Sequence, residues 1–136
     1  MKIVLDVSAA FAIVRGTAGS EWMIEAIQTA QEVIVPDLYV SEASNTAWKF
    51  FHIEGASLED IHLLAQRSLE LPDHITPSIS LWEDALSLAH ELDHPVYDCM
   101  YLVLAKKEGA QLMTLDKKLR RLAKKINLPI NTKADS

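Results

Sequence analysis

Four acidic residues stand at positions where local structure alone gives little reason for a charge. Asp6 ends the short apolar run 3–5, and Asp116 ends another apolar run late in the chain. Glu42 and Asp98 lie in segments with helical periodicity, and Asp98 stands among apolar neighbours, so we expect it to be poorly hydrated. A buried carboxylate costs free energy unless it is hydrogen-bonded, paired or bound to a metal. Taken singly, each acid has an ordinary alternative role as a helix cap or first-turn acid.

The four acids are expected at one edge of a parallel sheet. Two of them follow strands, two come early in helices that follow strands, and ligands of open parallel sheets bind outside the carboxyl ends of the strands. Carboxylates that lie together raise one another's pKa unless a cation neutralises them. Oxygen donors, without cysteine and nearly without histidine, suit Mg²⁺ or Mn²⁺ rather than zinc. Such ions activate water and hold phosphates for displacement, so the pattern predicts metal-assisted chemistry on a phosphate.

The segments that would position these acids alternate between short apolar runs and helical patterns, which indicates an α/β fold. Strands are expected at 3–5, 33–35, around Ile75 and at 110–115, and the run 128–130 would make a fifth, edge strand. Helices are expected at 8–14, 20–30, 37–54, 57–71, 80–92, 95–107 and 117–125. We therefore predict one domain, residues 1–136, with a doubly wound three-layer α/β/α sandwich around a central parallel sheet of four or five strands.

Details of two helices bear on the site. In the helix at 37–54, Asp37 would cap the start, and the core stripe would be Val40, Ala43, Ala47 and Phe50 or Phe51. Glu42, Asn45 and Lys49 share another face of that helix, because they are spaced i, i+3, i+7. The segment 96–107 is apolar almost all round and should form a central buried helix. Ser80 and Glu83 have capping-box spacing at the start of the helix before it.

Composition limits the class of protein. The 136 residues are 49% hydrophobic, which is typical of a folded globular chain. No apolar stretch approaches the roughly 20 residues that cross a bilayer, and the N-terminus is unlike a signal peptide, so we expect a cytoplasmic protein without a membrane partner. The single Cys99 excludes an internal disulfide and should be a small buried apolar residue.

Charge is unevenly distributed along the chain. The net charge of −6 argues mildly against a general nucleic-acid binder. Residues 54–98 contain ten acids and one base, whereas residues 106–125 contain eight bases and two acids. The basic run surrounds Asp116. It can be a solvated helix face, or it can bring a phosphate backbone to an acidic site.

Three segments together resemble one family. They are LDVSAAF (5–11), SEASNTAWKF (41–50) and YDCMYLVLAKKEGAQLMTLDKKL (97–119). With their spacing, they resemble PIN-domain proteins over essentially the whole chain, and by size the VapC-type toxin endoribonucleases of bacterial toxin–antitoxin pairs. In that family four acids coordinate one or two divalent ions, which by resemblance are Asp6, Glu42, Asp98 and Asp116.

The resemblance also implies supporting residues and partners. Ser8 and Thr114 match hydroxyl positions near the metal, and Asn45 matches a polar residue one turn after the helix acid. The residue after the first Asp is often Thr or another small polar residue in the family, and Val7 departs from that pattern. The implied reaction is RNA cleavage by a water that Mg²⁺ or Mn²⁺ activates, leaving 5′-phosphate and 3′-hydroxyl ends. A homodimer and a small antitoxin that plugs the site are implied as well. RNA phosphates would be held by Lys117, Lys118, Arg120 and Lys49.

Other functions are compatible with the same residues. The chain could be a catalytically silent PIN-like binding or scaffold domain, a housekeeping RNA-processing nuclease, or a domain whose acids hold a structural metal. A phosphatase or receiver-like domain, which also uses acids at strand ends, is less favoured. A receiver would need a phosphoacceptor Asp after the third strand and a Lys after the fifth, and neither is visible in the sequence. The five histidines are scattered and are expected to be surface or cap residues, and the three tryptophans are expected in the core or an interface.

Overall fold

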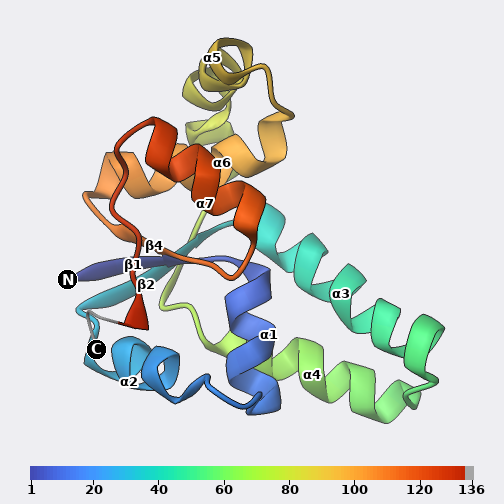
Figure 1. Cartoon of the computed structure of the whole chain (residues 1–136). Coiled ribbons are helices and arrows are strands. Elements are labelled where there is room, and N and C mark those ends of the chain that lie inside the picture. Colours follow the sequence, from blue (N-terminus) through green and yellow to red (C-terminus); the bar gives the residue numbers. More distant parts are fainter. Residues whose placement is uncertain (134–136) are drawn as a thin grey trace.

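The computed structural model of the protein describes residues 1–133 and is built on a four-stranded parallel sheet (Figure 1). The strands are β1 (Lys2–Leu5), β2 (Glu32–Pro36), β3 (His74–Thr76) and β4 (Gln111–Met113), in the order β3-β2-β1-β4. All three strand pairings are parallel. The last three residues of the expected domain, 134–136, lie outside the described residues.

Helices cover both faces of this sheet, as expected for a three-layer α/β/α sandwich (Figure 1). One layer contains α1 (Val7–Arg15), α2 (Glu21–Thr29), α3 (Leu38–Glu54) and α4 (Leu58–Glu70). The other contains α5 (Trp82–Leu92), α6 (Val96–Glu108) and α7 (Lys117–Lys125), preceded by the 3-10 turn η1 (Ser78–Ser80). Strand side chains alternate between the two cores, so Ile3 and Leu5 pack on the first layer and Val4 on the second.

The strand order contains one reversal of direction. From β1 the chain adds β2 and then β3 on one side, and it later places β4 on the other side of β1. Open α/β sheets bind ligands where such a reversal occurs, outside the carboxyl ends of the strands. Here that point lies between β1 and β4. Asp6 follows β1 directly, its backbone N–H donates to the Met113 carbonyl at 3.1 Å, and Asp116 follows β4.

The expected fifth strand is wrong as a full element. Within the described residues it is a single parallel bridge between Leu112 and Ile130. The Leu112 N–H donates to the Pro129 carbonyl at 3.0 Å, and the Asn131 N–H donates to the Leu112 carbonyl at 2.8 Å. Pro129 has no N–H, and Asn127 has φ of 57°, so the backbone here cannot continue a regular ladder.

The two predicted side-chain caps of α3 and α5 do not form. Asp37 holds the N-cap position of α3, but its carboxylate accepts hydrogen bonds from the Ser78 N–H at 3.0 Å and from the Ser78 hydroxyl instead of capping the helix. The Ser80 hydroxyl donates to the Pro77 carbonyl at 2.8 Å, so it forms no capping box. The turn η1 uses these groups, and α5 therefore begins only at Trp82.

The buried stripe of α3 differs from the predicted one only at its start. Ala43 and Ala47 are buried and Phe50 packs against the same core, as predicted, but Tyr39 is buried in place of Val40, which is 37% exposed. The Tyr39 hydroxyl donates to the Ser68 carbonyl at 2.6 Å, so α3 places this aromatic ring against α4. Cys99 and the helix around it are buried, which confirms α6 as the central helix of its layer.

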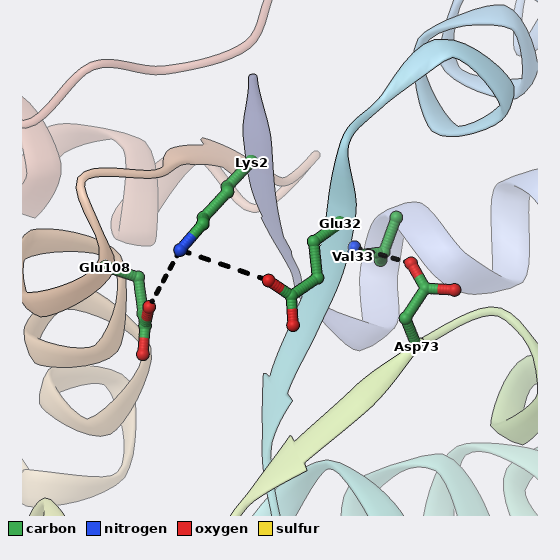
Figure 2. Close-up of polar contacts among 5 residues, drawn as sticks. All are labelled: Lys2, Glu32, Val33, Asp73 and Glu108. Atoms are coloured by element: carbon green, nitrogen blue, oxygen red, sulfur yellow. Dashed lines mark hydrogen bonds and ion pairs between the residues drawn. The ribbon is translucent and has the colours of Figure 1, made fainter.

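The amino edge of the sheet has balanced charges (Figure 2). The Lys2 ammonium lies 3.2 Å from a Glu108 carboxylate oxygen and 4.0 Å from one of Glu32. The Asp73 carboxylate accepts a hydrogen bond from the Val33 N–H at 2.8 Å. Each acid at this edge therefore has a partner. Separately, none of the helices in residues 1–133 has the length and apolar character needed to cross a membrane.

Candidate functional site

Asp6 is the most buried acid of the predicted set, with 7% of the residue exposed. Its Oδ1 accepts hydrogen bonds from the Ser8 hydroxyl at 2.7 Å and the Ala9 N–H at 3.1 Å, and its Oδ2 accepts one from the Thr114 hydroxyl at 2.7 Å. Burial raises the pKa of Asp6, the hydrogen bonds lower it in part, and the nearby charge of Asp116 raises it further. Asp6 does cap α1, yet three donors and a raised pKa go beyond what a cap requires.

Ser8 and Thr114 fasten the loops after β1 and β4 to each other. Their hydroxyl oxygens lie 3.3 Å apart. The Leu115 N–H donates to the Ser8 hydroxyl at 2.9 Å, and the Asp116 N–H donates to the Thr114 hydroxyl at 3.0 Å. Because both hydroxyls also donate to Asp6, they fix the orientation of its carboxylate. Both hydroxyls therefore contact the first acid of the predicted set, and their role near a metal stays a prediction.

Asp116 is exposed and caps α7. Its Oδ1 accepts hydrogen bonds from the Lys118 N–H at 2.8 Å and the Leu119 N–H at 3.1 Å. Within residues 1–133 no protein group donates to its Oδ2. The capping role considered for this residue is therefore real, and it leaves one carboxylate oxygen available to a ligand.

Glu42 is half-buried in the second turn of α3 and is held from α6. The Tyr101 hydroxyl donates to its Oε1 at 2.6 Å, and Tyr101 is itself only 2% exposed. Burial raises the pKa of Glu42, the Tyr101 hydrogen bond lowers it, and the charges of Asp6 and Asp98 raise it further. The pKa of Glu42 therefore depends on the charges of both Asp6 and Asp98.

Asp98 is better hydrated than its sequence neighbours predicted, with 31% of its side chain exposed. The buried side of α6 begins at Cys99 and Tyr101, and Asp98 lies off that side. The Asp98 Oδ2 lies 2.7 Å from Nε2 of His94, whose side chain is only 9% exposed. The expectation of a surface or cap histidine is therefore wrong for His94.

Electrostatic effects connect the four acids into one group. The charge of Asp116 acts on Asp6, and the charges of Asp6 and Asp98 act on Glu42. In the part of the chain that the structure describes, no lysine or arginine forms an ion pair with any of them. Their mutual repulsion is thus left largely unbalanced by the protein, apart from the His94 contact.

The donor chemistry of this group fits a hard divalent cation. All of its donors are carboxylate oxygens, and Asp116, Glu42 and Asp98 each keep one oxygen without a protein donor within residues 1–133. Mg²⁺ and Mn²⁺ prefer such oxygens. As the described side chains stand, however, no three His, Cys, Asp or Glu residues are arranged to hold a metal ion.

The predicted RNA-binding residues differ in how free they are. Lys117 and Lys118 are exposed in the first turn of α7, beside Asp116. Arg120 is half-buried, and its Nε donates to the Thr114 carbonyl at 3.1 Å, so it also braces the loop after β4. Lys49 is exposed on α3. Asn45 is exposed there too, and its side chain makes no hydrogen bond within the described residues.

Sequence reasoning missed two residues that touch the acids. His94 lies in the turn just before α6, four residues before Asp98, and Tyr101 lies in α6, three residues after Asp98. Their polar atoms reach Asp98 and Glu42 respectively. The i, i+4, i+7 spacing was visible in the sequence, but it could not show that the Tyr101 hydroxyl meets a carboxylate from another helix.

Comparisons with known proteins identify the family of the chain. A family model described as the PIN domain matches residues 3–125. A relative named Ribonuclease VapC3, from Pyrobaculum aerophilum, is 32% identical over 88% of this chain and 92% of its own length.

Solved structures share the fold at low identity. The crystal structure of PAE2754 from Pyrobaculum aerophilum has a TM-score of 0.72 at 20% identity, covering 90% of this chain and 79% of its own. VapBC2 from Rickettsia felis, bound to a DNA fragment from their promoter, has a TM-score of 0.65 at 13% identity, covering 96% and 98%. FitAcB from Neisseria gonorrhoeae has a TM-score of 0.66 at 15% identity, covering 98% and 99%.

Proposed function

The chain belongs to the PIN-domain family, and from that membership we propose that it is an endoribonuclease of the VapC toxin type that depends on Mg²⁺ or Mn²⁺. In this proposal residues 1–136 form a single nuclease domain. Asp6, Glu42, Asp98 and Asp116 are its catalytic residues and would hold the ion. The relative named as a ribonuclease supports the reaction class.

The main structural support for the proposal is the crowding of these acids. Asp6 and Asp116 lie at the switch point of the sheet, and Glu42 feels the charges of Asp6 and Asp98. Burial raises the pKa values of Asp6 and Glu42, and the charge of Asp116 raises that of Asp6 further. A fold gains no stability from such crowding, because like charges held together oppose folding. A cation would relieve the repulsion, and perturbed carboxylates of this kind concentrate at functional sites.

Residues around the four acids would orient them and hold the RNA. When bound, a divalent ion lowers the pKa of a water ligand and offsets the charge of a phosphodiester. Ser8 and Thr114 orient the Asp6 carboxylate, Tyr101 orients Glu42, and Asn45 lies one turn further along α3 as a polar supporting residue. The exposed ammonium groups of Lys117 and Lys118 would attract RNA phosphates to Asp116. Arg120 and Lys49 would extend that contact.

The partners follow from the same family membership. We propose a small antitoxin that covers the acids, which the structural likeness to VapBC2 supports, and a homodimer. Large apolar side chains exposed on α3 and α5 are available for these contacts, among them Trp48, Phe51 and Trp82. RNA and antitoxin would both be met in the cytoplasm. Light scattering should give a dimer mass at micromolar concentration without antitoxin, and a monomer mass would contradict the dimer.

The direct test of the nuclease is the exchange Asp98→Asn. It keeps the shape of the side chain and removes one anionic oxygen donor from the site. Cleavage of RNA in Mg²⁺ or Mn²⁺ should fall by two or more orders of magnitude, which corresponds to about 3 kcal/mol of barrier. Gel assays of purified wild type and variant, each with and without EDTA, measure the effect.

Asp93→Asn is the matched control. Asp93 ends α5 with φ of 50°, a conformation that asparagine also tolerates, so this exchange should leave activity unchanged. Near wild-type cleavage by Asp98→Asn, or equal cleavage by the wild type in EDTA, would contradict the proposed nuclease and favour a silent scaffold. A gene for a small DNA-binding antitoxin beside this one would favour a toxin over a housekeeping nuclease.

A further inference from the structure

His94 occupies a special position among the histidines of the chain. Within residues 1–133 it is the one histidine whose ring makes a hydrogen bond, to Asp98 Oδ2 at 2.7 Å. Its side chain is 9% exposed, although it lies in the turn between α5 and α6. A buried ring in a surface turn loses hydration, so a specific polar contact is needed to offset that loss.

The backbone around His94 fixes where the ring can go. The His94 N–H donates to the Ala89 carbonyl at 3.0 Å, which ties the residue to the last turn of α5. Pro95 follows with φ of −54° and starts α6, and its ring restricts the backbone of the preceding residue. The His94 ring is therefore held over the first turn of α6, where Asp98 lies.

The direction of the hydrogen bond follows from the chemistry of the two groups. An ionised carboxylate can only accept, so Nε2 of His94 must carry the hydrogen whenever Asp98 is charged. A donor on an ionised acceptor gives a short and comparatively strong bond, in keeping with the 2.7 Å distance. The contact occupies Oδ2 and leaves Oδ1 without a protein donor among the described residues.

We propose that His94 is a positioning residue for Asp98, fixing its Oδ2 so that Oδ1 is presented to a divalent cation. This inference rests on the proposed function, because it concerns the same set of acids. Asp98 needs such a support more than Asp6 does: it is partly exposed, and no second protein donor holds it. Partners of metal-binding carboxylates typically alter metal affinity by 10- to 100-fold when they are removed.

The test measures Mn²⁺ binding to metal-free protein by isothermal titration calorimetry. His94→Leu keeps much of the buried volume and removes the donor, so its Kd for Mn²⁺ should rise by about 10- to 100-fold. His94→Gln places an amide nitrogen as many bonds from Cβ as Nε2 is, so its Kd should stay within about threefold of wild type. His90→Leu, at an exposed histidine of α5, is the control and should bind like wild type.

Melting temperatures in EDTA separate positioning from packing. The Gln and Leu variants should differ in Mn²⁺ affinity even where they melt alike. If His94→Leu does not fold, His94→Asn replaces it, because the shorter amide cannot reach Asp98. Wild-type Mn²⁺ affinity in the Leu or Asn variant would overturn the inference, and so would a Gln variant that folds yet binds as weakly as Leu.

The same experiment distinguishes this inference from the proposed function. If the wild type binds Mn²⁺ in a His94-dependent way but does not cut RNA, the nuclease proposal fails and the positioning role stands. If the wild type cuts RNA and His94→Leu binds Mn²⁺ normally, the nuclease stands and the positioning role fails. If the wild type binds no Mn²⁺, the positioning role is overturned.

Discussion

The acids at the amino ends of the strands and those at the carboxyl ends have different kinds of partner. At the amino edge, Lys2 lies between Glu32 and Glu108, and the Asp73 carboxylate accepts a backbone N–H (Figure 2). At the carboxyl edge, no lysine or arginine of the described chain pairs with Asp6, Glu42, Asp98 or Asp116. Their partners are hydroxyls, backbone N–H groups and one imidazole.

This difference separates charges that serve the fold from charges that oppose it. Hydrogen bonds from neutral donors orient a carboxylate but do not cancel its charge, so repulsion among the four acids remains. The amino edge shows that the same sheet can accommodate acids with a cationic partner beside them. Where a protein leaves such repulsion in place, a ligand is the usual reason, because functional sites retain features that stability alone disfavours.

The largest expected effect comes from Asp6→Asn compared with Glu32→Gln. Both exchanges neutralise an acid at a strand end, but only Asp6 belongs to the proposed site. RNA cleavage in Mg²⁺ or Mn²⁺ should fall by two or more orders of magnitude for Asp6→Asn, about 3 kcal/mol of barrier, and stay near wild type for Glu32→Gln. Equal losses in the two variants would show that the edges do not differ in function.

Asp6→Asn, which should lower activity, should raise the free energy of unfolding when metal is absent. Because burial raises the pKa of Asp6 above its ordinary 3.8, the folded state holds the proton more tightly than the unfolded state. The free energy of unfolding contributed by Asp6 is therefore highest below pH 3.8 and declines as the pH rises through the folded pKa.

Urea unfolding in EDTA across this pH range measures that contribution. Asp6→Asn should become more stable than wild type as the pH rises through the folded pKa, and divalent metal should remove its advantage. Destabilisation of Asp6→Asn at every pH would mean that the hydrogen bonds to Ser8 and Thr114 outweigh the cost of burying the charge.

The sequence predicted which acids lie at the carboxyl edge but not all of the contacts that hold them. Asp6 and Asp116 could be placed because an acid that closes an apolar run must lie at a strand end, and parallel strand ends share one edge. Ser8 and Thr114 followed from resemblance. The Tyr101 contact to Glu42 could not be predicted, because it joins α6 to α3 and depends on how two helices in different layers meet.

The errors of local structure arose where contacts depend on segments distant in sequence or on the rotation of a helix. Asp37 and Ser80 carry the signature of helix caps, but η1 intervenes between β3 and α5 and offers their side chains other partners. Asp98 seemed buried because its neighbours in sequence are apolar, yet a helix turns about 100° per residue, so neighbours need not share its surroundings. Short-range pattern thus identified elements better than it identified contacts.

A smaller effect, on the free energy of unfolding, is expected from Tyr101→Phe, which removes a contact between α6 and α3. The exchange removes the one donor to Glu42 found within residues 1–133, and hydrogen bonds to charged groups contribute roughly 1.5–3 kcal/mol. Since that bond lowers the pKa of Glu42, its loss should raise the pKa further. Thermal unfolding should show a loss of about 1–2 kcal/mol, less than the full value because Glu42 is partly solvated.

Tyr97→Phe is the matched control for this prediction. Tyr97 is 65% exposed on the same helix, so loss of its hydroxyl should change the unfolding free energy by less than about 0.5 kcal/mol. If Tyr101→Phe were as mild as Tyr97→Phe, the bond to Glu42 would not hold the two layers together.

The smallest effect should come from Lys2→Gln at the amino edge. Lys2 and both glutamates are about one-third exposed, so water screens their attraction, and exposed ion pairs typically contribute about 0.2–1 kcal/mol. Urea unfolding should show a loss in this range that shrinks in 1 M salt, where the Debye length is about 3 Å. RNA cleavage should be unchanged, because Lys2 lies at the opposite end of β1 from Asp6. A cleavage loss without a matching loss of stability would mean that the two edges communicate, and that charge balance at one edge helps to set the geometry of the other.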